Sequence, residues 1–370
     1  MTAPVLSDRV LDRTLLARQG LLERTTAAPA DVVDGLVGLQ AQVPTNPYLA
    51  LWSRLDGFRP PALEARLLDR TLVRLVLQRG TIHLVTAADA LGLRTLFQPV
   101  LDQELARHRD HAPLLVGVDL APVLAAGRDL LTEPRTLPQL KTALAARFPT
   151  LHPAALAFAC RNRLALVQVP PRGLWSRSGQ VAYATAEAWL GQPVDPMPSL
   201  PALLLRYLRA FGPAATADMA TWSRLTGLRD VVEGLAGSLR SYRDERGRTL
   251  LDVPDGHLAT GDEPAPVRFL PEYDNVLLSH ADRSRIIAPD AGALFPGDGM
   301  GRGSVLVEGL LQASWRLERP TATAPATLAV RHRPGLRAAA LRAVTAEGRR
   351  TLAFLTDGLD GGSVVLSPAD

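Results

Sequence analysis

The feature that most constrains the fold of this chain is a local pattern that occurs three times, in which predicted helices are followed directly by short strands. In the first copy, apolar residues recur at helical spacing over Leu6–Gln19, over Pro29–Leu39 and from Pro60 up to Gly80. The alternating segment Thr81–Val85 follows as a short strand, and Thr86 is placed to cap the next helix.

The other two copies end in pairs of strands. Helices predicted over Arg135–Pro149 and from His152 precede two strands on either side of Pro170–Gly173. A later pair of helices, the first starting near Thr216, precedes a hairpin that turns at Gly247. Because helix pairs followed by a two-stranded wing are typical of winged-helix modules, the repeated pattern predicts modules of this kind.

The segment after Gly261 has a different character. Strands are predicted over 267–280, 303–318 and 326–332, and a closing helix over 335–355. The Gly-rich stretch 295–305 lacks the lysine of a Walker loop and is interpreted as a hairpin tip. We therefore expect an α+β fold with winged-helix modules over residues 1–100, 101–195 and 196–260 and a β-rich module over 261–370.

Composition excludes several classes of protein. With 47% hydrophobic and 21% charged residues, the chain is globular and not disordered. It has neither a run of about 20 apolar residues nor an apolar signal core in its first residues. The single cysteine, Cys160, can form neither an internal disulfide nor a multi-cysteine zinc site. We therefore expect a reduced cytoplasmic protein without membrane contact.

The basic residues are almost all arginine, and Lys141 is the only lysine. Arginine forks bind phosphate through two parallel hydrogen bonds. A pI near 9.7 therefore permits binding to nucleic acid but does not establish it, because many basic proteins bind none.

Two glutamines interrupt an apolar run. Gln40 and Gln42 flank Ala41 within Val33–Trp52, and a buried apolar segment has no use for amides unless something satisfies them. They either cap the end of the preceding helix or serve a functional site. The sequence contains no zinc-ligand spacing, nucleophile elbow or dinucleotide fingerprint, so we expect no metal and no cofactor.

Two other polar groups stand out. His83 alternates with apolar strand residues, where a histidine most often has a structural role. Glu272 and Asp274 are two positions apart, which on a strand would place both on one face; the alternative is an exposed turn.

Five segments, in order along the chain, resemble the AlkZ-type bacterial DNA glycosylases: GLQAQVPTNPYLALWSRL, RGTIHLVTAADA, RGLWSRSGQVAYATAEAWL, RYLRAFGPAATADMATWSRL and FLPEYDNVLLSHADRS. The resemblance implies three tandem winged-helix motifs around a C-shaped DNA cleft. The family's catalytic motif is glutamine, an apolar residue, then glutamine or aspartate, and Gln40, Ala41 and Gln42 match it. Ala41 is smaller than the usual aliphatic residue. The form with two glutamines resembles the self-resistance branch that unhooks interstrand crosslinks.

The chemistry of such substrates explains why an amide pair would suffice. An N7-alkylguanine already carries a positive charge, so it leaves with little acid catalysis through an oxocarbenium-like sugar. The remaining task is to hold a water molecule at C1′ and to stabilise positive charge, which an oriented glutamine carbonyl can do. Strand cleavage through a Schiff base requires an amine, and only Lys141 and the N-terminus could supply one. A monofunctional glycosylase is the expectation.

Further site residues are expected beside the family-like segments. Arg79, Arg283 and Arg285 are candidates for phosphate contact, although any of them could instead pair with a carboxylate. Thr81 and His83 alternate on one strand face and would point together toward the duplex, where they could bond a phosphate or the water-bearing glutamine. Asp274 would supply negative charge beside the oxocarbenium, or would pair with Arg283 or Arg285 to hold the β-rich module closed.

Double-stranded DNA carrying alkylated purines or crosslinks is the expected partner, bound by a monomer. One alternative is a regulator or adduct sensor built from winged helices, which would have no need of Gln40 and Gln42. Another is a protein that sequesters the alkylating compound itself, which would bind the free compound without DNA.

Overall fold

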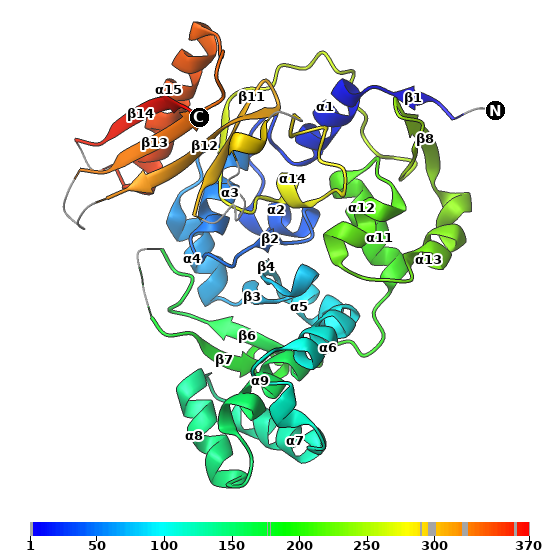
Figure 1. Ribbon diagram of the computed structural model, residues 1–370, viewed down its shortest axis with the longest axis vertical. Helices are drawn as coiled ribbons and strands as arrows, with labels where there is room; N and C mark the ends of the chain where they lie inside the picture. Colours follow the sequence, from blue (N-terminus) through cyan, green and yellow to red (C-terminus); the bar gives the residue numbers. More distant parts are fainter. Residues whose placement is uncertain are drawn as a thin grey trace.

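The computed structural model describes residues 3–175, 177, 179–288, 291–294, 301–319, 325–358 and 361–369, and its fold is mixed α+β (Figure 1). Three sheets organise it. The largest has the strand order β2 (Leu39–Gln40), β4 (Ile82–Thr86), β3 (Leu72–Val76), β6 (Leu166–Val169), β7 (Ala182–Thr185) and β5 (Arg135–Thr136), with every pairing antiparallel.

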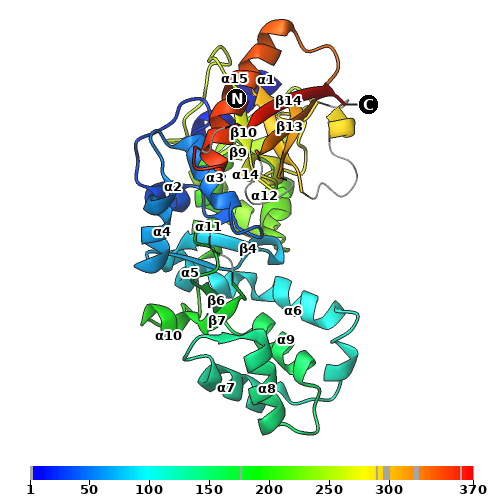
Figure 2. The same cartoon turned by 90° about the vertical axis from the view of Figure 1, so that its left-hand side faces the viewer.

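This six-stranded sheet joins two hairpins from separate parts of the chain. The hairpins β3–β4 and β6–β7 meet where Arg74 pairs with Gln168 and Leu75 with Val167. The sheet therefore runs across the boundary expected near residue 100. Figure 2 shows the helices that lie between residues 120 and 163, labelled α7, α8 and α9, below β6 and β7, at the end of the molecule far from α15.

Helices cover both faces of this sheet. On one face, Leu39, Leu72 and Leu84 pack with residues of the N-terminal helices α2 (Pro29–Gly35), α3 (Asn46–Arg54) and α4 (Pro60–Leu68). The other face packs in the main core with residues of α1 (Asp8–Arg18), α5 (Ala87–Leu93), α6 (Gln98–Arg107), α11 (Leu200–Phe211), α12 (Thr216–Ser223) and α13 (Leu228–Leu235). A separate core holds α7 (Leu120–Leu130), α8 (Leu137–Arg147) and α9 (Pro153–Arg163). The short helix α10 (Ala186–Leu190) directly follows β7.

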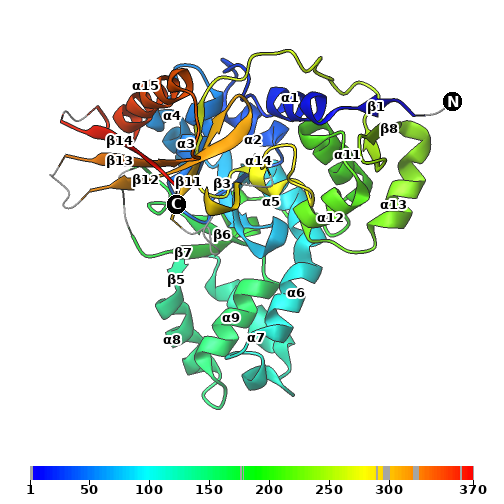
Figure 3. The same cartoon turned by 45° about the horizontal axis from the view of Figure 1, so that its top comes forward.

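The other two sheets are smaller. β8 (Arg240–Asp244) and β9 (Thr249–Asp252) form the predicted hairpin with its turn at Gly247, where φ is +78°, and β1 (Val5–Leu6) adds to β8 in parallel. The C-terminal sheet has the order β10 (Arg268–Leu270), β11 (Gly303–Val307), β12 (Leu310–Glu318), β13 (Thr327–His332) and β14 (Ser363–Pro368). α15 (Ala338–Leu355) packs on it, and Figure 3 shows this group and the α11–α13 group on opposite sides of the molecule.

Four predictions of local structure are wrong. The helix predicted from Pro60 to Gly80 ends at Leu68 and continues as β3 and a 3-10 turn, and the one predicted over Pro29–Leu39 ends at Gly35. Only Arg268–Leu270 of the strand predicted over 267–280 is extended; α14 (Asn275–Leu278) follows it. The last helix does not close the chain, because β14 returns to pair with β13. Residues 295–300 of the predicted hairpin tip lie outside the described residues.

Candidate active site

A tight turn places the first glutamine on the sheet. The last carbonyls of α2 accept hydrogen bonds from the N–H groups of residues 36–38, and φ is +54° at Val37 and +95° at Gly38. A Cβ on Gly38 would lie 2.7 Å from Cγ1 of Val85, so only glycine lets the turn approach β4 this closely. The chain then enters β2, where Gln40 pairs with His83.

The two glutamines differ in their surroundings. Gln40 is 8% exposed, and its Oε1 has no hydrogen-bond partner among the described residues. Gln42 lies beyond the strand and is exposed, and its Oε1 accepts a hydrogen bond from the N–H of Ile82 at 3.2 Å. The alternative in which these amides cap the preceding helix is not seen: backbone N–H groups bond the carbonyls of residues 32–34, and no hydrogen bond joins either glutamine side chain to α2 within the described residues.

His83 is buried beside Gln40. Its Nδ1 lies 2.9 Å from the carbonyl oxygen of Thr81, and its Nε2 lies 3.3 Å from Nη2 of Arg79. Burial, and then the charge of Arg79, lowers the pKa of His83 to about 3. We infer from these partners that the neutral ring donates from Nδ1 to Thr81 and accepts at Nε2 from Arg79.

Arg79 is held in an unusual backbone conformation. Its φ is +59°, and its Nη1 donates to the carbonyl oxygen of Trp222 at 2.7 Å. Burial lowers its pKa to about 10, and no carboxylate within the described part of the chain pairs with it. Thr81 precedes the strand and donates its hydroxyl to the carbonyl of Gln78 at 3.2 Å. The partners of the Thr81 hydroxyl and of the His83 ring are thus backbone carbonyls and Arg79, and their expected contact with the duplex stays a prediction.

Asp274 lies inside the protein. It is the N-cap of α14, following a turn in which Tyr273 has φ of +61°, so the expected strand face shared with Glu272 does not form. Its two oxygens accept from Nη1 and Nη2 of Arg54 at 2.9 and 2.8 Å, and both side chains are fully buried. The structure thus pairs Asp274 with Arg54, and the suggested pairing with Arg283 or Arg285 is wrong.

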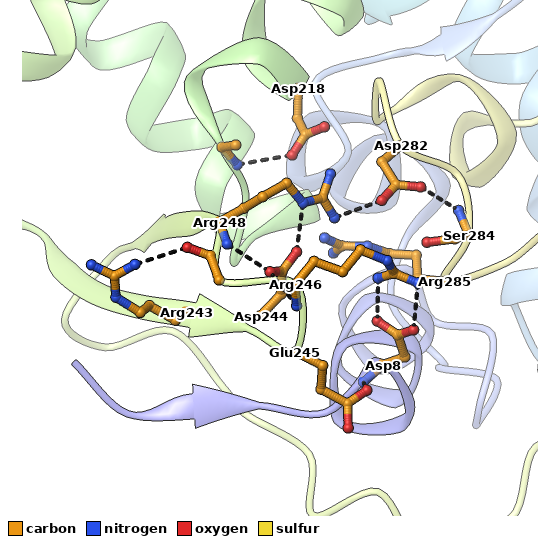
Figure 4. A network of polar contacts seen from close by, with 12 residues as sticks. Asp8, Asp218, Arg243, Asp244, Glu245, Arg246, Arg248, Asp282, Ser284 and Arg285 are labelled. Atoms are coloured by element: carbon orange, nitrogen blue, oxygen red, sulfur yellow. Dashed lines mark hydrogen bonds and ion pairs between the residues drawn. The ribbon is translucent and has the colours of Figure 1, made fainter. Parts of the chain in front are cut away.

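The two C-terminal arginine candidates have opposite environments. Arg283 is exposed, and its side chain forms no hydrogen bond or ion pair with the described residues. Arg285 is buried and donates from Nη1 to the carbonyl of Pro213 at 3.2 Å. Figure 4 shows Arg285 beside a network in which Arg248 bridges Asp244 and Asp282 and Arg246 pairs with Asp8. A phosphate could reach Arg283 but not Arg285.

A further arginine, which sequence reasoning missed, touches the glutamine motif directly. Nη2 of Arg74 donates to the carbonyl of Ala41 at 2.7 Å. The signal was a charged residue at the centre of the otherwise apolar segment LVRLV, which the helix prediction concealed.

Other kinds of site find no support in the described residues. No cluster of three or more histidine, cysteine, aspartate or glutamate side chains could hold a metal ion. Among the same residues, no helix combines the length and apolarity that crossing a membrane requires.

The fold agrees with the comparisons. The family model described as "DNA glycosylase AlkZ-like" matches residues 33–354. The chain therefore belongs to the AlkZ-like DNA glycosylase family. The solved structure of Streptomyces sahachiroi DNA glycosylase AlkZ is similar, with a TM-score of 0.79 and 20% sequence identity over 98% of this chain and 100% of that one. A search of curated proteins gives no match.

Proposed function

We propose that this protein is a monofunctional DNA glycosylase that hydrolyses the N-glycosidic bond of bulky N7-alkylated purines and unhooks interstrand crosslinks. The observation that carries the proposal is the unpartnered, buried Oε1 of Gln40 beside the accessible Gln42. A buried acceptor without a partner costs about 1–3 kcal/mol, so its retention calls for a ligand that satisfies it.

A water molecule at C1′ of the damaged nucleotide is that ligand. The two amide oxygens orient the water, whose oxygen bonds to C1′ as the C1′–N9 bond breaks. The bonding electrons neutralise the cationic base, and the proton released from water passes to solvent. Because the alkylated base is already activated, no carboxylate is needed to take that proton in the rate-limiting step.

DNA contact is assigned to the exposed arginines. Of the residues expected at the duplex, Arg283 has the free, exposed guanidinium that a phosphate needs. Arg79, Thr81 and His83 support the edge of β4 next to the motif, while Arg285 and Asp274 hold the fold. In this proposal the three helix-and-wing regions are winged-helix modules that cradle the duplex in a C-shaped cleft.

The proposed enzyme lacks lyase activity, because strand cleavage would require an amine that forms a Schiff base with the sugar. Lys141 lies on α8, in the separate core formed by α7, α8 and α9. The only other amine is the N-terminus, and in this proposal neither amine reaches C1′ to form a Schiff base. The product is therefore an intact strand with an abasic site. A role in self-resistance to a DNA-alkylating natural product is part of the proposal, supported by the two-glutamine form of the motif.

The test is incubation with a duplex that contains one bulky N7-alkylguanine, followed by alkali, which cleaves abasic sites. A new cleavage band that requires alkali, together with no borohydride-trapped protein–DNA adduct, is the expected result. Binding without a band would leave a DNA-binding regulator or sensor and would refute the proposal.

A further inference from the structure

Arg74 is a buried cation that directly contacts the peptide unit between the two glutamines. It is 2% exposed, and its Nη2 donates to the carbonyl of Ala41 at 2.7 Å. Ala41 itself is fixed from the other side, since its N–H donates to the carbonyl of Ile82 at 2.8 Å. The backbone that carries Gln40 and Gln42 is therefore held at both of its central polar groups.

Stability does not explain this arginine. Within the described residues no carboxylate pairs with Arg74, and its Nε and Nη1 atoms are buried without hydrogen-bond partners. Burial lowers its pKa to about 10. An apolar residue of similar size would avoid the cost of burying a charge, which amounts to several kcal/mol for an ion. Costly groups of this kind concentrate at functional sites.

The loop between β6 and β7 supports the guanidinium from the other side. Gly173 has φ of +100°, and a Cβ there would lie 2.9 Å from Cδ of Arg74 and 3.1 Å from its Nη1. The hydroxyl of Tyr48 donates to the carbonyl of Gly173 at 2.8 Å, and the N–H of Trp175 donates to Glu64 at 2.9 Å. The segment RGLW, Arg172–Trp175, is thereby fixed against Arg74.

We infer that Arg74 is a positioning residue for the glutamine motif, and that the loop around Gly173 holds it in place. The role rests on the proposed function. A carbonyl bonded to a cationic donor is held more firmly than one bonded to a neutral amide. Because a displacement of about 1 Å can cost about a hundredfold in rate, fixing Ala41 determines whether both amides meet the same water molecule.

The test compares Arg74→Met with Arg94→Met. Arg94 is a matched control: it is 3% exposed, burial also lowers its pKa to about 10, and it donates to the carbonyls of Asn162 and Leu164 far from the motif. Arg74→Met should lower the single-turnover excision rate by roughly 10- to 100-fold while the Kd for duplex is unchanged. Arg94→Met should leave the rate of the folded protein unchanged.

Two further experiments test the role of Arg74: a pair of glycine variants and chemical rescue. Gly173→Ala should reproduce the slow excision, whereas Gly127→Ala, whose Cβ would meet Sγ of Cys160 at 2.5 Å, should affect stability alone. Added methylguanidinium should partly restore excision by Arg74→Ala. Equal excision by the Arg74 and Arg94 variants would overturn the inference.

Amide hydrogen exchange separates this inference from the proposed function. Exchange in the peptide covering residues 39–46 should accelerate in Arg74→Met and not in Arg94→Met. If the wild-type protein excises nothing, the proposed function fails and this comparison still decides whether Arg74 fixes the motif. Unchanged exchange in both variants would contradict the positioning role.

Discussion

Two regions of the molecule remove arginine side chains from solvent, and they differ in whether a carboxylate neutralises the charge. At the junction of α3 and α14, Arg54 meets Asp274 in a fully buried pair with two hydrogen bonds. In the six-stranded sheet, Arg74 of the inner strand β3 and the half-buried Arg79 just beyond its end donate to backbone carbonyls, and neither has a carboxylate partner within the described residues.

This difference suggests a structural role for the paired arginine and a functional role for the arginine without a carboxylate. The buried ion pair neutralises both charges and holds two segments together, and only Nε of Arg54 lacks a partner there. The six-stranded sheet keeps a buried cation without a counter-charge, together with unpartnered polar atoms on Arg74 and Gln40, which is a cost that a ligand or a reaction can offset. The following predictions test this contrast, from the largest expected effect to the smallest.

Replacing the glutamines should have the largest effect. Gln40→Ala and Gln42→Ala should each reduce excision by roughly 10- to 1000-fold, the scale of losing one oriented polar group, while binding to duplex is largely kept. Single-turnover excision of a bulky N7-alkylguanine and a separate binding titration measure the two quantities. Wild-type rates for both variants would remove these glutamines from the site.

Asp274→Asn should act on stability. Removing the charge leaves Arg54 buried and unpaired, which costs about 3–5 kcal/mol. The melting temperature should fall by several degrees while the protein that remains folded excises at the wild-type rate. The contrast between the regions fails if excision falls and melting does not, because Asp274 would then act on the reaction.

Replacing Arg283 and replacing Arg285 should have different effects on the salt dependence of duplex binding. Arg283→Ala should weaken duplex binding and reduce the slope of log K against log salt by about one, as expected for one lost phosphate contact. Arg285→Ala should lower the melting temperature and leave the slope unchanged, since Arg285 is buried. Salt titrations of both variants against wild type measure the slopes.

His83 should make a pH-dependent contribution to stability. Its pKa is about 3 in the folded protein against an ordinary 6.5, so folding favours the neutral ring. This contribution is complete above pH 6.5 and is lost as the pH falls from 6.5 toward 3. Melting temperatures measured from pH 7 to pH 4 should therefore decline more steeply for wild type than for His83→Gln. Parallel curves would contradict a buried neutral histidine.

Local signals predicted much of the fold. Thr86 caps α5 by accepting from the N–H of Asp89, and the Gly247 turn closes the β8–β9 hairpin, because both depend on neighbouring residues alone. β3 was missed because its segment is buried on both faces except at one end, so the two-residue alternation disappears. β14 was missed because a parallel pairing with β13 depends on a distant segment.

The candidate site could be predicted only in part from the sequence, because some of its contacts join distant segments. Gln40, Gln42 and His83 lie close in sequence or share one strand pair, and the structure brings Gln40 and His83 together. The role of Asp274 depends on Arg54, which lies 220 positions earlier, and no spacing rule connects them. The contact of Arg74 with Ala41 likewise becomes visible only once β2, β4 and β3 are arranged side by side.

The short pairing of β3 with β6 affects how a force would pass between the two hairpins. Only two residue pairs, Arg74–Gln168 and Leu75–Val167, join the hairpins of the two regions there. A force on the helices beyond β6 would reach the first hairpin through this pairing as well as through the packing of α6 on α9. Arg74 is one of the two β3 residues in this pairing and also bonds the glutamine motif, so a duplex that moves the far helices would alter the motif's geometry through it.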